Sequence, residues 1–413
     1  MLYDGGKPSA WAYILDTLAR DLNVVIVVSA GNLPILGMFG KRTEQLVVNF
    51  PQYLLEKKSK IIDPAPAANV ITVGALAHSE TSHLMSRYPN DPAIKCIAGI
   101  DQPSPFTRSG PGVNEAIKPE VCEYGGNITW PGHGRILMQD PETSIISMNV
   151  KHLERLFTAN VGTSFAAPKI THLAGLILKH YPDISANLVR ALIVNAATPP
   201  VAVSPILNKD EILKLCGYGR PDRERALFSA DHRVTLITEE EIALDTIHLY
   251  EIPLPNEFKQ AKGKRRITVS LAFDPPVRHT RKDYLGLKIS FRLLRGLSTK
   301  RIIQWYAKRS ADIKPEQIPT RHICKMSPSP TRREGGTLQK AIFTARQNRV
   351  FTDYAGDVFH LLVRCQAGWA SPEEFDHQNY ALAVTIEHLD DSLQIYNVIK
   401  QRLQLAPRIR IRR

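Results

Sequence analysis

Helical and strand-like patterns of apolar residues alternate over the first eighty positions of the chain. In residues 9–22, apolar side chains recur at the three- and four-residue spacing of a helix: Trp11, Ile14, Leu15, Leu18, Ala19 and Leu22. The run 24–28 is continuous and β-branched, as expected for a strand buried in a parallel sheet. Residues 33–66 read as a loop with a short helix, and 70–76 repeats the strand pattern. This alternation predicts an α/β region built on a parallel sheet.

Two further helices are predicted downstream. The segment 165–178 is apolar on nearly all sides, so we expect its helix to be buried. The turn 181–183 ends that helix, and Ser185 then caps a second one over about 185–193.

From about residue 231 apolar residues recur at every second position, as they do in strands with one buried face. Seven short segments show it: 234–237, 246–252, 266–273, 287–291, 340–344, 358–363 and 380–386. Strands of this number between turns predict an antiparallel β-sandwich. We therefore divide the chain into an α/β domain over 1–230 and a β-sandwich accessory domain over 231–413, with an irregular insertion near 297–335 that holds one helix at 302–307. The Arg–Ile tail at 408–413 is expected to be an edge strand or a frayed end.

Composition places the chain among folded, non-membrane proteins. Its 413 residues are 43% hydrophobic and 23% charged, which is enough to bury more than one core. The sequence contains no run of 18 apolar residues and so does not predict a transmembrane helix, and the N-terminus lacks a signal-peptide pattern. The five cysteines are odd in number and widely spaced, so we expect free thiols in a reducing compartment and a cytoplasmic location.

The net charge of +13 raises the question of nucleic-acid binding. The basic residues are spread thinly apart from 262–266, 332–333 and 408–413, and no aromatic side chains are interleaved with them. Nucleic acid is therefore not an expected partner. A positive field can instead attract acidic substrates or a partner chain.

The candidate chemistry lies in two short motifs. Gly-Thr-Ser-Phe-Ala-Ala-Pro at 162–168 opens directly into a helical pattern, which places Ser164 where backbone N–H groups and the helix dipole favour negative charge. Ser-Ala-Gly-Asn at 29–32 follows a predicted strand, and the Asn32 amide can donate to an oxyanion. The alternatives are an N-capping residue followed by an early proline at 162–168, and a simple Gly-Asn turn at 29–32.

Together these motifs resemble the subtilase family of serine endopeptidases, with Ser164 as nucleophile and Asn32 in the oxyanion hole. Weaker stretches follow in the family's order: 66–75, 106–111, 117–121 and 217–219. Glu120 stands where the family has Asp, and Cys122-Glu-Tyr-Gly-Gly replaces its Ala-Pro-Gly. The resemblance covers about residues 10–230 and implies a partial subtilisin-like sheet with flanking helices. It also implies hydrolysis of polypeptide substrates through an acyl-enzyme. No cofactor is expected; the family allows calcium, but no dense Asp/Asn loop marks a site.

The family's catalytic Asp and His are expected before the Ser-Ala-Gly-Asn strand. Asp4 lacks the preceding hydrophobic strand, no histidine precedes His78, and His133 falls out of order and reads as a loop histidine. The resemblance therefore implies the C-terminal part of a catalytic domain, as a truncated gene, a split gene or a fragment would give. Without a base, Ser164 is a poor nucleophile. We expect the chain to be inactive alone, with the missing N-terminal segment or an adjacent chain as its partner.

Two alternatives stay open at this level. The chain could be a non-catalytic binding module derived from a subtilase, whose β region docks a partner. A sedolisin-like peptidase shares a Gly-Thr-Ser motif but uses acidic partners, and the Ser-Ala-Gly-Asn motif argues against it. His279, His360 and His377 are isolated and are expected to be surface or packed residues.

Overall fold

The fold comprises two compact units, each assembled from separate stretches of chain. The computed structural model describes residues 2–39, 43–132, 136–252, 254–307, 318–346, 349–352, 359–389, 396 and 409–411. The first unit comprises 1–16, 25–179 and 196–223, and the second comprises 17–24, 180–195 and 224–413. The predicted domain division at residue 230 stays a prediction.

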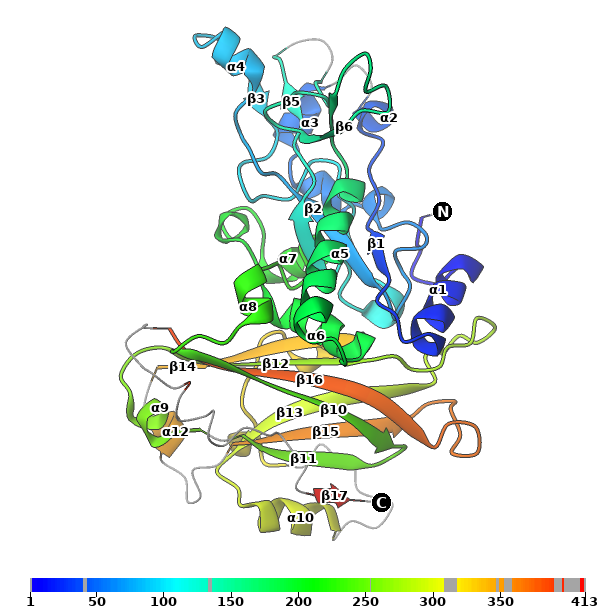
Figure 1. Cartoon of the computed structure of the whole chain (residues 1–413), viewed down its shortest axis with the longest axis vertical. Coiled ribbons are helices and arrows are strands. Elements are labelled where there is room, and N and C mark those ends of the chain that lie inside the picture. Colours follow the sequence, from blue (N-terminus) through cyan, green and yellow to red (C-terminus); the bar gives the residue numbers. More distant parts are fainter. Residues whose placement is uncertain are drawn as a thin grey trace. The chain divides into compact units, whose positions relative to one another are not determined.

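A three-stranded parallel sheet lies at the centre of the first unit (Figure 1). Its strands are β1 (Val27–Ser29), β2 (Ile71–Leu76) and β4 (Val121–Tyr124), in the order β1-β2-β4. The register pairs Val27 with Ile71 and Val73 with Val121. Every residue of β2 is buried, and the predicted parallel sheet is confirmed. The run 24–28, predicted to be a buried strand, differs: β1 covers only Val27–Ser29, its residues are half-buried, and Val24 is 40% exposed.

Helix α1 (Ala10–Asp21) is confirmed, but its small residues, and not its bulky ones, face the sheet. Trp11 and Ile14 are 61% and 51% exposed, whereas Ala12 and Asp16 are fully buried. Ala12 packs with Ala67 and Val70, and this close approach needs a small side chain. The Asp16 carboxylate accepts hydrogen bonds from the backbone N–H groups of residues 68 and 69 at 2.9 and 2.6 Å.

Helix α5 (Thr163–His180) corrects the expectation of burial on all sides. Ile170, Leu173 and Ile177 are buried, but Leu178 is 38% exposed, and small or polar residues between 164 and 175 are exposed as well. The prediction failed because it counted apolar residues without weighing the polar stripe between them. The next helix, α6 (Ala186–Ala196), has the predicted apolar residues buried.

Short elements complete the first unit. They are α2 (Ile35–Phe39), α3 (Glu44–Val48), η1 (Gln52–Leu55), η2 (Lys57–Ser59), α4 (His83–Arg87), β3 (Lys95–Cys96), η3 (Val113–Glu115), β5 (Thr129–Trp130), β6 (Ile145–Met148), β7 (Phe157–Asn160), β8 (Ala197–Thr198), η4 (Val201–Val203), α7 (Lys209–Leu215) and β9 (Arg220–Pro221).

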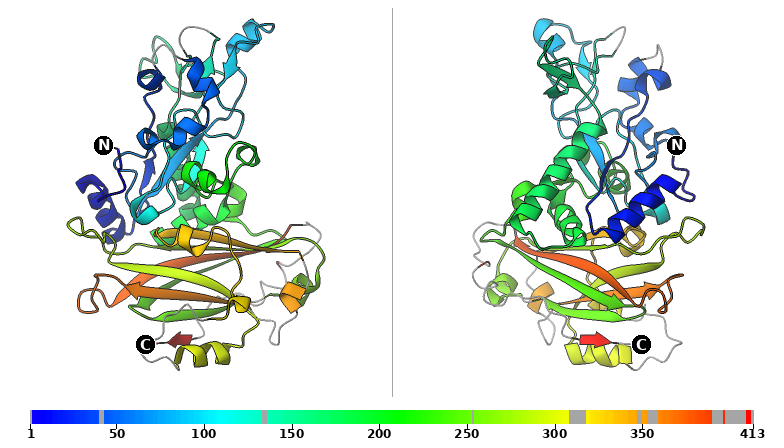
Figure 2. Two further views of the ribbon diagram at one scale, coloured as in Figure 1. Left: turned by 180° about the vertical axis from the view of Figure 1, so that it is seen from behind. Right: turned by 45° about the vertical axis from the view of Figure 1, so that its right-hand side comes forward.

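The second unit contains two four-stranded antiparallel sheets (Figure 2). One has the order β10-β16-β12-β14, with β10 (Arg233–Ala243), β16 (His377–His388), β12 (Arg265–Phe273) and β14 (Leu338–Ala345). The other has the order β13-β15-β11-β17, with β13 (Leu287–Arg295), β15 (Phe359–Ala367), β11 (Ile247–Ile252) and β17 (Ile409–Ile411). All seven predicted strand segments are confirmed, and the described part of the Arg–Ile tail is strand β17.

Apolar side chains from both sheets form one core cluster. Val234, Ile267 and Leu382 come from one sheet, and Ile289 and Leu361 come from the other. The predicted helix in the insertion is α10 (Thr299–Ala307), while residues 308–317 lie outside the described part. Short helices complete the list: α8 (Arg223–Leu227), α9 (Asn256–Gln260), η6 (Thr320–His322), α11 (Pro330–Arg333) and α12 (Arg349–Thr352).

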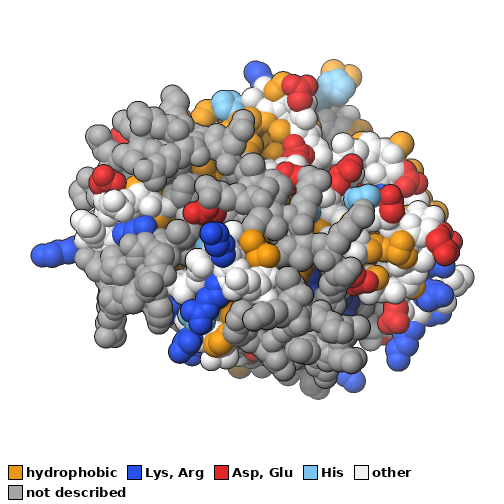
Figure 3. All heavy atoms as spheres, turned by 90° about the horizontal axis from the view of Figure 1, so that it is seen from below, with side chains coloured by type: hydrophobic (Ala, Val, Ile, Leu, Met, Phe, Trp, Pro, Cys, Tyr) orange, Lys and Arg blue, Asp and Glu red, His pale blue; other side chains and the backbone are white. Residues whose placement is uncertain are grey.

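The structure is therefore a mixed α/β fold with a small parallel sheet and several antiparallel sheets, consistent with a subtilisin-like fold. Among the described helices, none is long and apolar enough to cross a membrane. On the face drawn in Figure 3, acidic and basic side chains lie interspersed over the coloured surface and do not gather into one basic patch.

Candidate active site

Ser164 is the second residue of α5 and is exposed at the N-terminus of that helix. The first residue, Thr163, is fully buried. The helix therefore presents the Ser164 hydroxyl to solvent where its first backbone N–H groups have no partner within the helix. This is the placement that the motif at 162–168 predicted.

Asn32 follows β1 and meets the first turn of α5. Its Oδ1 accepts hydrogen bonds from the Thr163 N–H at 2.9 Å and from the Thr163 hydroxyl at 3.1 Å. The Gly31 N–H donates to the same threonine hydroxyl at 3.2 Å. The structure thus brings the two sequence motifs together. It fixes the oxygen end of the Asn32 amide, so the nitrogen end is the one that can serve another acceptor.

Gly162 allows this close approach. A Cβ at that position would lie 3.1 Å from Nδ2 of Asn32, so a larger residue would crowd the amide. The backbone is also held, because the Gly162 N–H donates to the carbonyl of Gly125 at 2.9 Å. Glycine at 162 therefore leaves the Asn32 amide the space that a side chain there would crowd.

Arg108 supports Asn32 from the other side. Its Nε donates to the Asn32 carbonyl at 3.0 Å, and its Nη1 donates to the carbonyls of Lys60 and Lys58 at 2.8 and 3.2 Å. Burial lowers the pKa of Arg108, although it still carries its charge at neutral pH. The stretch 106–111, noted in the sequence only as a family-like motif, thus holds the asparagine loop in place.

A buried ion pair explains the Lys-Pro-Glu stretch at 118–120. The Nζ of Lys118 lies 2.6 Å from Oε1 of Glu120, and both side chains are almost fully buried. Lys118 also donates to the carbonyl of Val70 at 3.0 Å, and Glu120 Oε2 accepts from the N–H of Thr72 at 2.8 Å. The pair therefore ties the start of β4 to β2.

Neither the sequence motifs nor the described contacts supply a base for Ser164. Within the described residues, Ser164 Oγ makes no hydrogen bond. His133 lies outside the described residues. Asp4 has no described contact with Ser164; its carboxylate accepts from the N–H of Gly6 at 2.8 Å.

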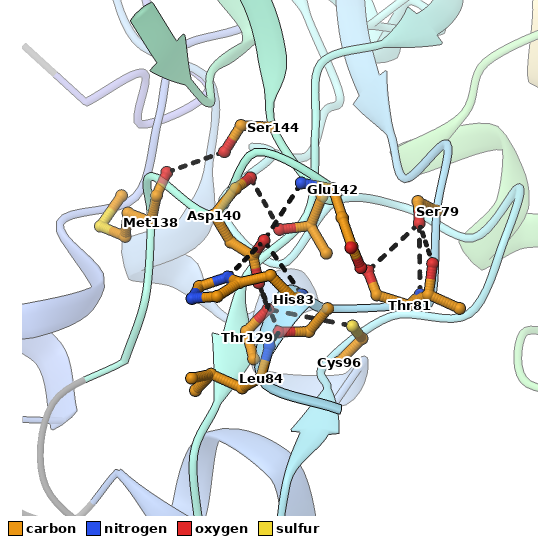
Figure 4. Close-up of polar contacts among 12 residues, drawn as sticks. Ser79, Thr81, His83, Leu84, Cys96, Thr129, Met138, Asp140, Glu142 and Ser144 are labelled. Atoms are coloured by element: carbon orange, nitrogen blue, oxygen red, sulfur yellow. Dashed lines mark hydrogen bonds and ion pairs between the residues drawn. The ribbon is translucent and has the colours of Figure 1, made fainter. Parts of the chain in front are cut away.

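Sequence reasoning missed one Asp–His pair elsewhere in the first unit (Figure 4). Nδ1 of His83 lies 2.9 Å from Oδ1 of Asp140, which is buried. Burial raises the pKa of Asp140, but hydrogen bonds from Ser82, His83 and Thr129, and from the N–H at residue 142, leave the pKa below its usual value. The two residues are 57 positions apart, so no local pattern could have paired them. No described contact links His83 to Ser164.

Candidate metal and thiol chemistry is limited. Among the residues that the structure describes, no group of His, Cys, Asp and Glu side chains could hold a metal ion. All five cysteines are free, as predicted. Burial raises the pKa of the Cys96 thiol to about 11, so this half-buried thiol is weakly reactive.

The match to a known family agrees with this geometry. The model of the subtilase family matches residues 3–219, more than half of the chain. The chain therefore belongs to the subtilase family of serine peptidases. The predicted resemblance is confirmed.

Individual relatives add context. The chain is 40% identical over 410 residues to the uncharacterized protein y4bN of Sinorhizobium fredii, covering 98% of this chain and 93% of that protein. Among solved structures it matches a protease of Pseudoalteromonas arctica, with 16% identity, a TM-score of 0.32, and coverage of 54% of this chain and 47% of the other. It also matches MycP1 of Mycobacterium smegmatis, with 20% identity, a TM-score of 0.27, and coverage of 52% and 44%. The chain spans about half the length of these solved structures.

Proposed function

We propose that the chain carries the nucleophile and the oxyanion hole of a subtilase-type serine endopeptidase. Ser164 Oγ attacks a peptide carbonyl as its proton passes to an imidazole. Asn32 Nδ2 and the Ser164 backbone N–H then hold the oxyanion. The imidazolium gives this proton to the leaving nitrogen as the intermediate collapses, so the C–N bond breaks, the amine departs and an acyl-enzyme remains on Ser164. Water, losing a proton to the same imidazole, then hydrolyses the acyl-enzyme and restores the Ser164 hydroxyl.

The anchoring of the Asn32 amide oxygen by Thr163 is the observation that supports this proposal. Both Thr163 donors bind Oδ1, so the amide nitrogen is the free end of the group next to the helix that begins with Ser164. An oxyanion donor must be held before the reaction starts, because a fixed dipole needs no reorganisation in the transition state. The asparagine loop, held by Arg108, meets that requirement.

The proton acceptor is the second part of the proposal. We infer that a polypeptide outside this sequence supplies the Asp and His, either as an N-terminal segment or as an adjacent chain. The chain alone then reacts slowly, since Ser164 Oγ has no hydrogen-bond partner among the described residues. The proposed substrate is a polypeptide in the cytoplasm, with no cofactor, nucleic acid or membrane involved.

The lack of a described hydrogen-bond partner for Ser164 Oγ also favours one alternative, a binding module derived from a subtilase. In this alternative the second unit is the docking part. We propose in either case that its two sheets form a β-sandwich accessory domain, because their apolar side chains share one core cluster.

Labelling with a fluorophosphonate probe separates these two functions. We expect slow labelling of the chain alone, fast labelling once a complementing segment with Asp and His is added, and none in Ser164→Ala. Ser185→Ala is a matched control, because Ser185 also stands at the start of a helix and caps it. Fast, stoichiometric labelling of the chain alone would contradict the missing base, and no labelling after complementation would favour the binding module.

A further inference from the structure

Strands β6 and β7 of the first unit form a two-stranded antiparallel sheet of their own (β6 in Figure 1). Among the described residues, no third strand pairs with either of them. A two-stranded hairpin is at best marginally stable in water, and an unpaired strand edge is a template for another chain. The hairpin therefore has free edges at which a further strand can add.

The register of the hairpin shows which backbone groups point outward. The N–H of Asn149 donates to the carbonyl of Leu156 at 3.0 Å, so this pair faces inward, and inward and outward pairs alternate along an antiparallel ladder. The N–H and C=O groups of Ile146 and Met148 therefore point to the outer edge of β6. Within the described part of the chain these groups make no hydrogen bond. The edge thus offers alternating donors and acceptors, which an extended polypeptide matches and a lipid surface does not.

The same residues carry an exposed apolar face. Side chains two apart on a strand point to one side, and Phe157 lies directly opposite Met148, so Ile146, Met148 and Phe157 share one face of the hairpin. They are 50%, 64% and 51% exposed, and Val150 and Leu153 near the turn are 92% and 93% exposed. Apolar side chains scattered singly over a surface need no explanation, but a group of this kind within one hairpin marks an interaction site.

The turn of the hairpin adds positive charge beside this face. Lys151 and Arg155 are exposed there, together with the single carboxylate of Glu154, which lies 3.7 Å from Lys151. Arg155 forms no ion pair with any described residue. Two cations against one carboxylate leave the turn positive, so a partner that brings an acidic residue to the turn is favoured over one that brings a basic residue.

We propose that the outer edge of β6 binds an extended, acidic-ended segment of another polypeptide, which adds to the hairpin as a third strand. The backbone of this segment pairs with Ile146 and Met148, and its apolar side chains, at alternate positions, lie beside theirs. An acidic residue at the end of the segment meets the positive turn. The site makes no use of Ser164 or Asn32, so it holds whether or not the chain is an active peptidase.

Fluorescence anisotropy on the full chain tests the proposal with a defined probe, a fluorescein-labelled peptide of alternating valine and threonine with aspartate at both ends. We expect saturable binding that weakens as salt is added, because the charges at the turn are exposed. The same peptide with proline at two adjacent central positions should not bind, since proline donates no hydrogen bond to a ladder. The peptide with lysine at both ends should bind roughly threefold more weakly or worse.

Variants locate the binding on β6. Met148→Pro removes an outward N–H and keeps the hydrogen bonds between β6 and β7, so it should abolish binding, while Met148→Leu should keep it. Ile146→Ser should weaken binding roughly fivefold or more, because an apolar contact is lost. Val201→Ser is the matched control, since Val201 is an exposed apolar residue on η4, outside the hairpin, and binding should not change. Hydrogen exchange over 157–160 checks that the hairpin stays intact in each variant.

Four outcomes would overturn the proposal. Two concern the strand edge: equal binding of the proline-containing peptide, or undiminished binding by Met148→Pro with an intact hairpin. The third is dimerisation of the chain alone in sedimentation velocity that Met148→Pro abolishes, which would make a second copy the occupant. The fourth is binding of vesicles of phosphatidylcholine and phosphatidylglycerol with no saturable binding of the peptide, which would make a lipid surface the occupant.

Discussion

Replacing Lys118 by Met should destabilise the first unit strongly. The change keeps a flexible stem of similar length but removes the charge that lies 2.6 Å from Glu120. Glu120 would then stay buried while losing the cation that lies against its carboxylate. It would still accept the hydrogen bond from the N–H of Thr72.

The magnitude follows from the burial of both groups. The side chains of Lys118 and Glu120 are only 1% and 4% exposed, so water cannot replace the lost partner. Removing one member of a buried pair typically costs about 3–5 kcal/mol. The carbonyl of Val70 also loses its donor, which adds about 1 kcal/mol. Because Met fills most of the space, we expect little cavity cost and a total of about 4–6 kcal/mol.

The assay is urea unfolding of the full chain, followed by hydrogen exchange in peptides from β2 and β4. Exchange resolves the first unit by itself, since two compact units need not unfold together. Lys151→Met is the control, because Lys151 and Glu154 form an exposed pair at 3.7 Å and the change should cost at most about 0.5 kcal/mol. The double variant Lys118→Met/Glu120→Gln should recover most of the loss. A Lys118→Met loss no larger than that of the control would refute the reasoning.

Three other outcomes are expected. Burial, together with the positive charges of Arg225 and Arg266, lowers the pKa of Lys340 from 10.5 to about 7. Between pH 7 and 10 the unfolded chain therefore binds more protons than the folded chain, so the free energy of unfolding should rise by up to about 1.4 kcal/mol per pH unit. In urea unfolding over this pH range, Lys340→Met should flatten the rise. Asp140→Asn should speed hydrogen exchange over residues 79–84, at a cost of about 1–3 kcal/mol, because charge-assisted hydrogen bonds are weakened. Asn32→Ala should slow probe labelling of complemented chain by roughly 10²–10³-fold, and Asn32→Asp, which keeps an oxygen for Thr163, should do the same.

Local patterns were sufficient for the longer elements. Period-two alternation placed the strands of the second unit, and the strand pattern at 70–76 placed β2. The short helices within 33–66 carry too few residues to show a period, and one helix was expected there where the structure has four. The outward positions of Trp11 and Ile14 could not be derived in the same way. Helical spacing identifies an apolar stripe, but packing against Ala67 and Val70 selected the small residue Ala12 for the close contact.

Only the part of the site that lies within the two short motifs could be predicted from the sequence. The motifs pointed to Ser164 and Asn32, and the structure brings them together. They did not reveal that Thr163 binds the Asn32 amide oxygen, or that Arg108 holds the asparagine loop. These contacts join residues far apart in the chain, and a single sequence carries no signal for such pairs.

The interleaving of the two units limits how the second one can be inherited. Residues 17–24 and 180–195 belong to it, although its main body begins at 224. Within the unit, the buried Arg190 donates to the carbonyl of Phe273 at 3.2 Å, and Asn195 Nδ2 donates to the carbonyl of Ala383 at 2.9 Å. A gene fusion or a recombination event with one crossover near residue 230 would leave both of these donors behind. The β-rich part therefore cannot be transferred as one contiguous segment. A chimaera that exchanges it between relatives must carry all three stretches together.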